Sequence, residues 1–128
     1  MSERILVDTD IIIDYLRGQP HAAGLLKEHA AEISFSVITF AEVLAGVLSN
    51  EEEKDVLALF GAFPLLPVSA EIASQAGRFM RTFRKSHGIE LPDALIAGTC
   101  AHYKLELFTL NVKHYPMLKN LAPPYRKN

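Results

Sequence analysis

The sequence has little of what several large classes of protein require. A single cysteine, Cys100, excludes an internal disulfide and suits a reducing compartment, so we expect a cytoplasmic protein. The 7 glycines are scattered and form no phosphate-binding loop, and the histidines show no zinc-ligand spacing. Apolar runs are short and interrupted by acids, which predicts no secretory leader, no membrane span and no membrane partner. Nucleotide-driven, zinc-dependent and membrane-embedded functions are therefore disfavoured.

Charge is nearly balanced overall but unevenly distributed. Residues 1–64 carry 4 Lys or Arg against 11 Asp or Glu, a balance of −7, whereas residues 65–128 carry 9 against 4, a balance of +5. Such polarity would let one region attract cations while another contacts phosphates. A chance division between solvated surfaces explains the same numbers equally well, so charge alone does not assign a partner.

Length and apolar periodicity predict the fold class. A chain of 128 residues corresponds to one domain, spanning 1–128. Short apolar runs predict strands at 5–7, 33–35 and 105–109, with a weaker strand at 65–68. Helical spacing predicts helices over 11–16, 40–48, 72–83 and 95–103, and a further helix beginning at Asn50 with Glu53 completing a capping box. Alternating strands and helices indicate an α/β fold, with a mainly parallel sheet covered by helices on both faces.

Three acids stand where such a fold can use them. Asp8 directly follows the first strand, at the carboxyl end where open α/β sheets place ligands, although it could equally cap the next helix. Glu42 lies on a helix face with small neighbours, where a lone glutamate is usually only solvated. Asp93 follows Pro92 in the first turn of a helix, where an acid also stabilises the helix dipole.

The combination of these acids is more informative than any one of them. Two carboxylates about 4 Å apart repel each other by about 4 kcal/mol at an effective dielectric constant of about 20. If the three acids converge, they must therefore hold a proton, separate or bind a cation. Oxygen ligands without histidine or cysteine favour Mg²⁺ or Mn²⁺ over zinc.

Four segments of the sequence resemble the PIN-domain family, and in particular its VapC branch of toxin ribonucleases. They are ILVDTDIIIDYL at 5–16, VITFAEVLAG at 37–46, LPDALIAGT at 91–99 and FTLNVKHY at 108–115. The similarity extends through nearly the whole chain, and the order and spacing of the first three segments are specific. The resemblance implies a three-layer PIN-like fold. It also implies a Mg²⁺- or Mn²⁺-dependent endoribonuclease that acts as the toxin of a toxin–antitoxin pair.

The same resemblance assigns roles to individual residues. Asp8 and Asp93 correspond to the metal ligands, and Glu42 corresponds to a second acid that orients or deprotonates water. Asn111 stands near the place where many family members have a fourth acid; it can orient water or phosphate but brings no charge. One tightly held ion is therefore expected rather than two. Thr109, at the end of its strand, is a further side chain that could hydrogen-bond within the site.

Partner surfaces are also expected. A basic ridge consists of Arg78, Arg81, Arg84 and Lys85, on the polar side of one helix, and would contact RNA phosphates or simply be solvated. Lys113 and His114 lie nearer the acids, and residues 125–127 are expected to form a flexible basic tail. The resemblance implies an RNA substrate, such as transfer RNA, together with a homodimer. It further implies a cognate antitoxin whose extended segment covers an apolar groove.

Two other functions fit parts of the sequence. A strand followed by Asp8-Thr9-Asp10 also resembles the opening of haloacid dehalogenase-type phosphatases, with Asp8 as nucleophile and Asp10 as the acid/base group. The region after Thr109 lacks the later acidic pair that such enzymes use for Mg²⁺. Asn111 prompts the second alternative, a catalytically weak PIN module that binds RNA or a partner without cleaving RNA.

Overall fold

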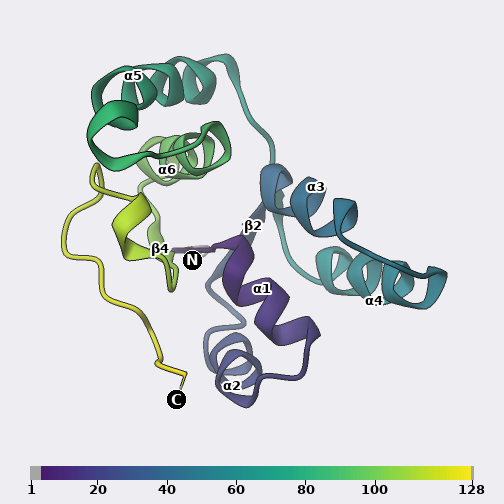
Figure 1. Cartoon of the computed structure of the whole chain (residues 1–128). Coiled ribbons are helices and arrows are strands. Elements are labelled where there is room, and N and C mark those ends of the chain that lie inside the picture. Colours follow the sequence, from purple (N-terminus) through teal and green to yellow (C-terminus); the bar gives the residue numbers. More distant parts are fainter. Residues whose placement is uncertain (1–3, 128) are drawn as a thin grey trace.

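A four-stranded parallel sheet forms the centre of the computed structural model, which describes residues 4–127 (Figure 1). The strands are β1 (Ile5–Val7), β2 (Ile33–Ser36), β3 (Leu65–Leu66) and β4 (Glu106–Phe108), in the order β3-β2-β1-β4. Leu6 of β1 lies opposite Ser34 on one side and Leu107 on the other. The predicted parallel sheet is confirmed, although β3 does not extend to Val68 and β4 is shorter than expected.

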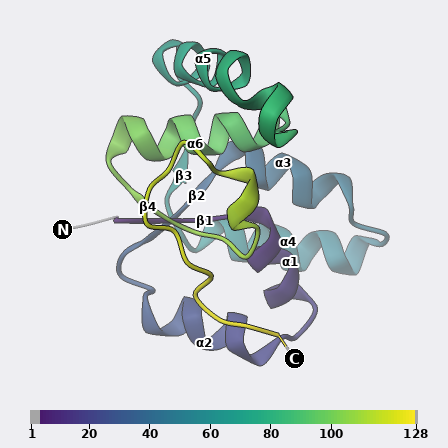
Figure 2. The ribbon, with the colours of Figure 1, turned by 60° about the vertical axis from the view of Figure 1, so that its left-hand side comes forward.

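Helices cover both faces of this sheet, as predicted. They are α1 (Thr9–Leu16), α2 (Pro20–Glu28), α3 (Val37–Ala45), α4 (Asn50–Gly61), α5 (Ala70–His87) and α6 (Leu91–Tyr103), followed by the short 3₁₀ helix η1 (Val112–His114). Helices α1, α2 and α4 share a core with one face, α6 covers the other, and α5 packs on the outside of α6 (Figure 2). Among the described residues, none of these helices has the length and apolar character needed to cross a membrane.

Alternation along β1 explains why both faces are covered. Ile5 and Val7 point into the core with α1, α2 and α4, whereas Leu6 joins the core beneath α6. All three side chains are buried, as in strands enclosed on both faces. The outer pair of helices is closely packed, because a Cβ atom on Gly98 of α6 would lie 3.0 Å from the Ile72 carbonyl oxygen of α5. The sheet and α6 therefore form a firm base for the strand ends.

The helix starts differ in detail from the sequence prediction. Ser49, not Asn50, caps α4: its hydroxyl accepts a hydrogen bond from the Glu52 amide (3.1 Å), and the Glu52 carboxylate accepts one from the Leu48 amide (2.7 Å). Helix α4 therefore begins at Asn50 as predicted, but Ser49 caps it, and Glu52 bonds the amide one residue before that cap instead of closing a capping box. Helix α6 begins at Leu91, so Pro92 occupies its second position rather than its first. Helix α2 was not predicted.

The C-terminal segment returns across the molecule to the helices of the opposite face (Figure 2). The Tyr125 hydroxyl donates to Asp14 Oδ2 (2.8 Å), Lys127 Nζ lies 3.0 Å from Asp14 Oδ1, and the Tyr125 ring stacks on His21 at 5.6 Å between centroids. The prediction of a flexible basic tail was wrong for residues 125–127, because a buried carboxylate on α1 holds them.

Candidate active site

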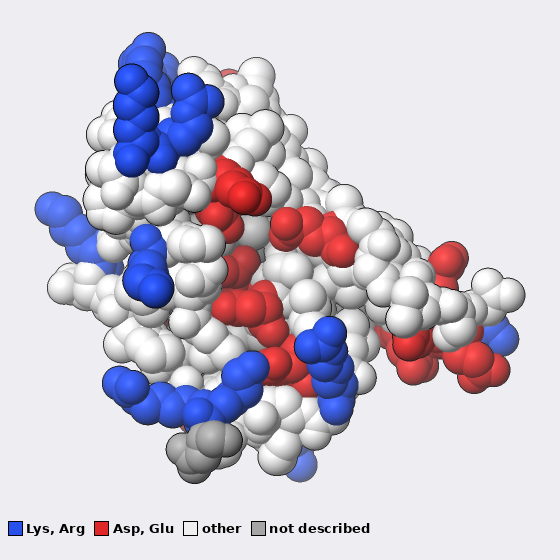
Figure 3. Space-filling view, viewed as in Figure 1, with Lys and Arg blue, Asp and Glu red and all other residues white. Residues whose placement is uncertain are grey.

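Acidic side chains form a band across the face of the molecule seen in Figure 1, and Lys and Arg side chains gather beyond its two ends (Figure 3). The band lies where the carboxyl ends of β1 and β4 meet. The chain passes from β1 to β2 on one side and places β4 on the other, so this is the point where the strand order reverses. Open α/β sheets bind ligands at such a point.

Asp8 is placed here by the strand before it and the helix after it. Its amide donates to the Phe108 carbonyl (2.9 Å), which extends the pairing of β1 with β4. Its Oδ1 accepts from the Thr9 amide (2.8 Å) at the start of α1, and its Oδ2 accepts from the Thr109 hydroxyl (2.7 Å). Both predicted positions of Asp8 are therefore confirmed: it lies at the carboxyl end of β1 and it also caps α1.

Tyr115 joins Asp8 to Asp93, a role that no pattern in the sequence indicates. The Tyr115 hydroxyl lies 3.0 Å from Asp8 Oδ2 and 3.5 Å from Asp93 Oδ1. Asp93 Oδ2 accepts from the Glu90 amide (3.3 Å) across the first turn of α6, and His114 Nδ1 lies 3.3 Å from the same oxygen. Two of the three predicted acids thus meet at one hydroxyl group.

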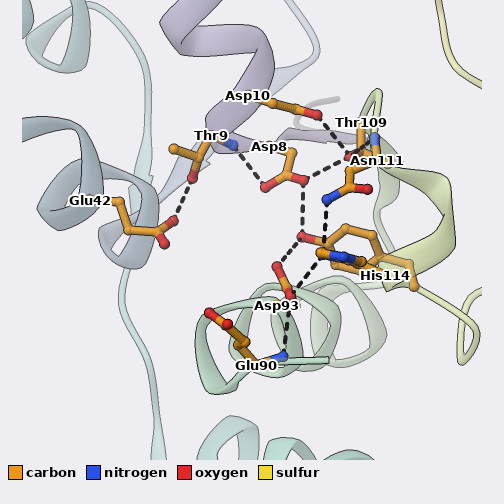
Figure 4. Close-up of polar contacts among 10 residues, drawn as sticks. Asp8, Thr9, Asp10, Glu42, Glu90, Asp93, Thr109, Asn111 and His114 are labelled. Atoms are coloured by element: carbon orange, nitrogen blue, oxygen red, sulfur yellow. Dashed lines mark hydrogen bonds and ion pairs between the residues drawn. The ribbon is translucent and has the colours of Figure 1, made fainter. Parts of the chain in front are cut away.

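Glu42 lies on the other side of Thr9 (Figure 4). Its Oε1 accepts from the Thr9 hydroxyl (2.7 Å), which is also 3.1 Å from the Thr39 hydroxyl. Within residues 4–127, Glu42 forms no hydrogen bond with Asp8 or Asp93, so α3 brings it to the edge of the site rather than into contact with the other two acids.

Asn111 faces His114 rather than the carboxylates. Its Nδ2 lies 2.8 Å from His114 Nδ1, and its amide donates to the Thr109 hydroxyl oxygen (3.0 Å). Asp10, which a phosphatase of the haloacid dehalogenase type would need as a free acid, is held by the backbone instead. Its Oδ1 accepts from the Ile11 amide (2.8 Å) and its Oδ2 from the Leu110 amide (3.0 Å).

The site has an excess of negative charge. In the part of the chain that the structure describes, no Lys or Arg forms an ion pair with Asp8, Asp10, Glu42 or Asp93. Burial and then the charge of Asp10 raise the pKa of Asp8, which is 6% exposed, to about 6. Burial also raises the pKa of Asp10, and burial followed by the charge of Asp8 raises the pKa of Tyr115 far above its usual range. The Tyr115 hydroxyl therefore remains a hydrogen-bond donor.

The donor set fits a hard divalent cation. The structure contains, over residues 4–127, no group of three or more His, Cys, Asp or Glu side chains arranged to hold a metal ion. Asp8 and Asp93 nevertheless offer two carboxylates close to one another, and Mg²⁺ commonly takes one or two protein carboxylates and completes its shell with water and phosphate oxygens. The residues present therefore suit Mg²⁺ or Mn²⁺ bound by Asp8 and Asp93, with Glu42 beyond the direct ligands.

A groove of about 330 Å³ lies beside these acids, between α1, α3 and α4. Its walls are Ile13, Leu16, Arg17, Glu42, Val43, Gly46, Val47, Leu48, Glu52, Asp55 and Val56. Glu42 belongs both to the groove and to the edge of the acidic site, so a segment lying in the groove would end close to the carboxylates.

Comparisons with known proteins agree with this geometry. The PIN domain family model matches residues 5–116. Ribonuclease VapC19 of Mycobacterium tuberculosis is 44% identical over 125 residues, which cover 94% of this chain and 98% of that protein. Ribonuclease VapC10 of the same species is 40% identical over 94% of this chain and 92% of its own length.

A solved toxin–antitoxin complex from Klebsiella pneumoniae contains a chain with the same fold. Its TM-score is 0.80 at 28% identity, and the match covers 96% of this chain and 99% of that chain. The phosphatase alternative finds no support in these matches or in the environment of Asp10. The chain belongs to the PIN-domain family, in its VapC branch.

Proposed function

We propose that this chain is an endoribonuclease that cleaves RNA phosphodiester bonds with Mg²⁺ or Mn²⁺ held by Asp8 and Asp93. The observation that carries the proposal is the meeting of two carboxylates at the Tyr115 hydroxyl, at the strand-order reversal, where no Lys or Arg of residues 4–127 is ion-paired with either carboxylate. The relatives VapC19 and VapC10 are named ribonucleases, which supports RNA as the substrate.

The residues of the site have different roles in the proposed in-line hydrolysis. When bound, the cation would offset charge on the scissile phosphate and make nearby water more acidic. Asp8 and Asp93 hold and orient it, while Glu42, fixed by the Thr9 hydroxyl, orients or deprotonates the attacking water. Water oxygen forms a new bond to phosphorus, one bridging P–O bond breaks, and the departing oxygen takes up a proton. Asn111 and His114 lie next to Asp93, where they can contact substrate phosphate.

The test is cleavage of a structured RNA, such as a transfer RNA pool, with Mg²⁺, Mn²⁺ or EDTA. Cleavage should need a cation and should fall by more than about 100-fold in Asp93→Asn, because loss of outer partners of a metal already costs about 10–100-fold. The matched control is Glu106→Gln, an exposed acid at the amino end of β4, which should cleave like wild type. Cleavage in EDTA would contradict the cation, and RNA binding without cleavage under any cation would favour a non-cleaving module.

The basic ridge is proposed as the surface for RNA phosphates flanking the cut. Arg81, Arg84 and Lys85 line a hollow of about 390 Å³ on α5, and only residues 88–90 separate α5 from α6, which carries Asp93. Lys and Arg side chains accordingly gather over α5, above the acidic band (Figure 3). Replacing Arg81 and Lys85 with glutamine should raise KM for RNA with little change in kcat. It should also reduce the salt slope of binding by about 1 to 2.

The groove beside Glu42 is proposed as the binding site for an extended segment of a cognate antitoxin. The solved toxin–antitoxin complex from Klebsiella pneumoniae has a chain with this fold. The groove walls combine the apolar side chains of Ile13, Leu16, Val43, Val47 and Val56 with the charged side chains of Arg17, Glu42, Glu52 and Asp55. Gly46 lies on the groove wall with φ −96°, and a Cβ atom added there would lie 3.7 Å from the nearest atom, the Val43 carbonyl oxygen, so the backbone accepts a side chain that extends into the groove. Gly46→Trp should keep RNA cleavage in vitro but escape neutralisation by the antitoxin in cells. We further propose a homodimer, which light scattering at twice the chain mass would establish.

A further inference from the structure

One hydroxyl group lies between the two carboxylates proposed to hold the cation. It belongs to Tyr115, which follows η1 and which the sequence patterns left without a role. We propose that Tyr115 is a positioning residue: its hydroxyl fixes the orientation of the Asp8 carboxylate and sets its relation to Asp93. The inference rests on the proposed function, since a cation is what the two carboxylates are positioned to receive.

The hydrogen bonds of Asp8 leave one direction open for a ligand. A carboxylate has about four acceptor positions, two on each oxygen. Both positions on Oδ2 are used, by the Thr109 hydroxyl (2.7 Å) and the Tyr115 hydroxyl (3.0 Å), and one position on Oδ1 is used by the Thr9 amide (2.8 Å). A cation can therefore bind Asp8 through Oδ1 and from one side. Without the Tyr115 hydroxyl, Oδ2 would regain a free position and the carboxylate could turn.

The single proton of Tyr115 makes its two contacts unequal. The hydroxyl is closer to Asp8 (3.0 Å) than to Asp93 (3.5 Å), so its single proton is directed mainly to Asp8 and its contact with Asp93 Oδ1 is the weaker of the two. Asp93 is held on its other oxygen by the Glu90 amide. Tyr115 thus fixes the Asp8 carboxylate while holding Asp93 Oδ1 only weakly, so that this oxygen stays available to a cation.

The hydroxyl is rigidly placed because its ring belongs to the core. Tyr115 is 1% exposed and packs with Leu6, Ile96, Ala97, Cys100 and Leu107 between the sheet and α6. Its amide also donates to the Val112 carbonyl (3.0 Å). A phenylalanine would fill the same space, so the role of the hydroxyl can be separated from the packing of the ring.

The test compares Tyr115→Phe with Tyr125→Phe, because both remove a tyrosine hydroxyl bound to a buried aspartate but only one lies in the site. Mn²⁺ binding is measured by calorimetry at one pH, with thermal unfolding as the check on folding. We expect wild type and Tyr125→Phe to bind alike and Tyr115→Phe to bind at least about 10-fold more weakly. Equal affinity in Tyr115→Phe would overturn the inference and leave the cation site standing. Absence of Mn²⁺ binding by wild type would overturn both.

A second measurement keeps the hydroxyl and so does not depend on the variant folding. With 3-fluorotyrosine at position 115, Mg²⁺ should shift the ¹⁹F resonance, whereas the same label at position 125 should not respond. A resonance at 115 that is unchanged under Mg²⁺, at a concentration that saturates the calorimetric site, would overturn the positioning role.

Discussion

Helix α1 carries two buried carboxylates that form an instructive pair. Asp8 at its start is 6% exposed and Asp14 near its end is 7% exposed, and each accepts a hydrogen bond from a tyrosine of the C-terminal segment, Tyr115 or Tyr125. Asp14 also has a cation, Lys127, 3.0 Å away. Asp8 has Asp10 as its charged neighbour.

The titration of the two groups differs accordingly. Burial acts to raise the pKa of both, but the hydrogen bonds from Tyr125 and Lys127 outweigh it at Asp14 and hold that pKa below its usual value. At Asp8 the pKa rises to about 6. Asp14 is therefore neutralised by a cation of the chain itself, whereas Asp8, which also caps α1, has no such partner within residues 4–127. The charge of Asp8 is left for a partner from solution, as the proposed cation would be.

The largest expected effect separates the two acids by activity. Asp8→Asn should lower RNA cleavage by more than about 100-fold, because it removes a proposed cation ligand rather than an outer partner. Asp14→Asn should cleave close to the wild-type rate, since Asp14 binds the C-terminal segment. Initial rates at saturating Mg²⁺ measure both. Comparable losses in the two variants would show that the contrast between them is not functional.

The next effect is on stability in EDTA at pH 7.5, and it has opposite signs at the two positions. The rise of the Asp8 pKa from 3.8 to about 6 means that ionised Asp8 destabilises the fold, so Asp8→Asn should raise the free energy of unfolding by roughly 1 to 3 kcal/mol. Asp14→Asn weakens the bonds to Tyr125 and Lys127 and should lower the free energy of unfolding by roughly 1 to 3 kcal/mol. Urea denaturation measures both. Destabilisation by Asp8→Asn would indicate that capping of α1 dominates at that position.

The pH dependence sharpens the same contrast. A raised pKa means that the folded state binds the Asp8 proton more tightly, so wild type should lose stability relative to Asp8→Asn as pH rises from about 4 to 6, and no further above. A lowered pKa at Asp14 means that its contribution is complete above about pH 4 and disappears only in more acidic solution. Unfolding free energies of wild type, Asp8→Asn and Asp14→Asn, measured in metal-free buffer between pH 2.5 and 8, should show the Asp8 effect between about pH 4 and 6 and the Asp14 effect only below about pH 4. A gap between wild type and Asp8→Asn that is constant across this pH range would contradict the assignment to Asp8.

The smallest effect on stability is expected from removing Lys127, the cation that lies beside Asp14. Lys127→Ala should lower the free energy of unfolding by roughly 0.2–1 kcal/mol, because the lysine side chain is half exposed and solvent screens its charge. Mn²⁺ affinity should not change. A variant that bound Mn²⁺ at Asp14 in place of the lysine would show that any buried acid on α1 can recruit a cation.

Much of the fold was predictable because it is encoded locally. The buried strands are short apolar runs, and Asp8 directly follows one of them. The sequence order alone therefore predicts that Asp8 lies at the carboxyl end of a strand. Helix α2 was missed because only Ala22, Leu25 and Leu26 mark its buried face. Both Ser49 and Asn50 have a glutamate three residues further on, so the sequence pattern alone does not show which of the two caps α4.

The parts of the site that could not be predicted depend on contacts between distant segments. Asp8 and Tyr115 are 107 positions apart, and nothing near Tyr115 in the sequence indicates that its hydroxyl turns toward an acid. Tyr125 and Lys127 were expected to be solvated because nothing in the sequence indicates that Asp14, a polar residue within an apolar helix, is their partner. Such contacts form only after the sheet has brought β1 and α1 close to the segment that follows β4.

The Thr109 to Asp8 hydrogen bond joins residues 101 positions apart, and the Tyr115 hydroxyl reaches the same oxygen. During translation Asp8 leaves the ribosome long before Thr109 and Tyr115 have been made. The donors that hold its carboxylate therefore arrive late, and a growing chain carries the acids without the geometry to use them.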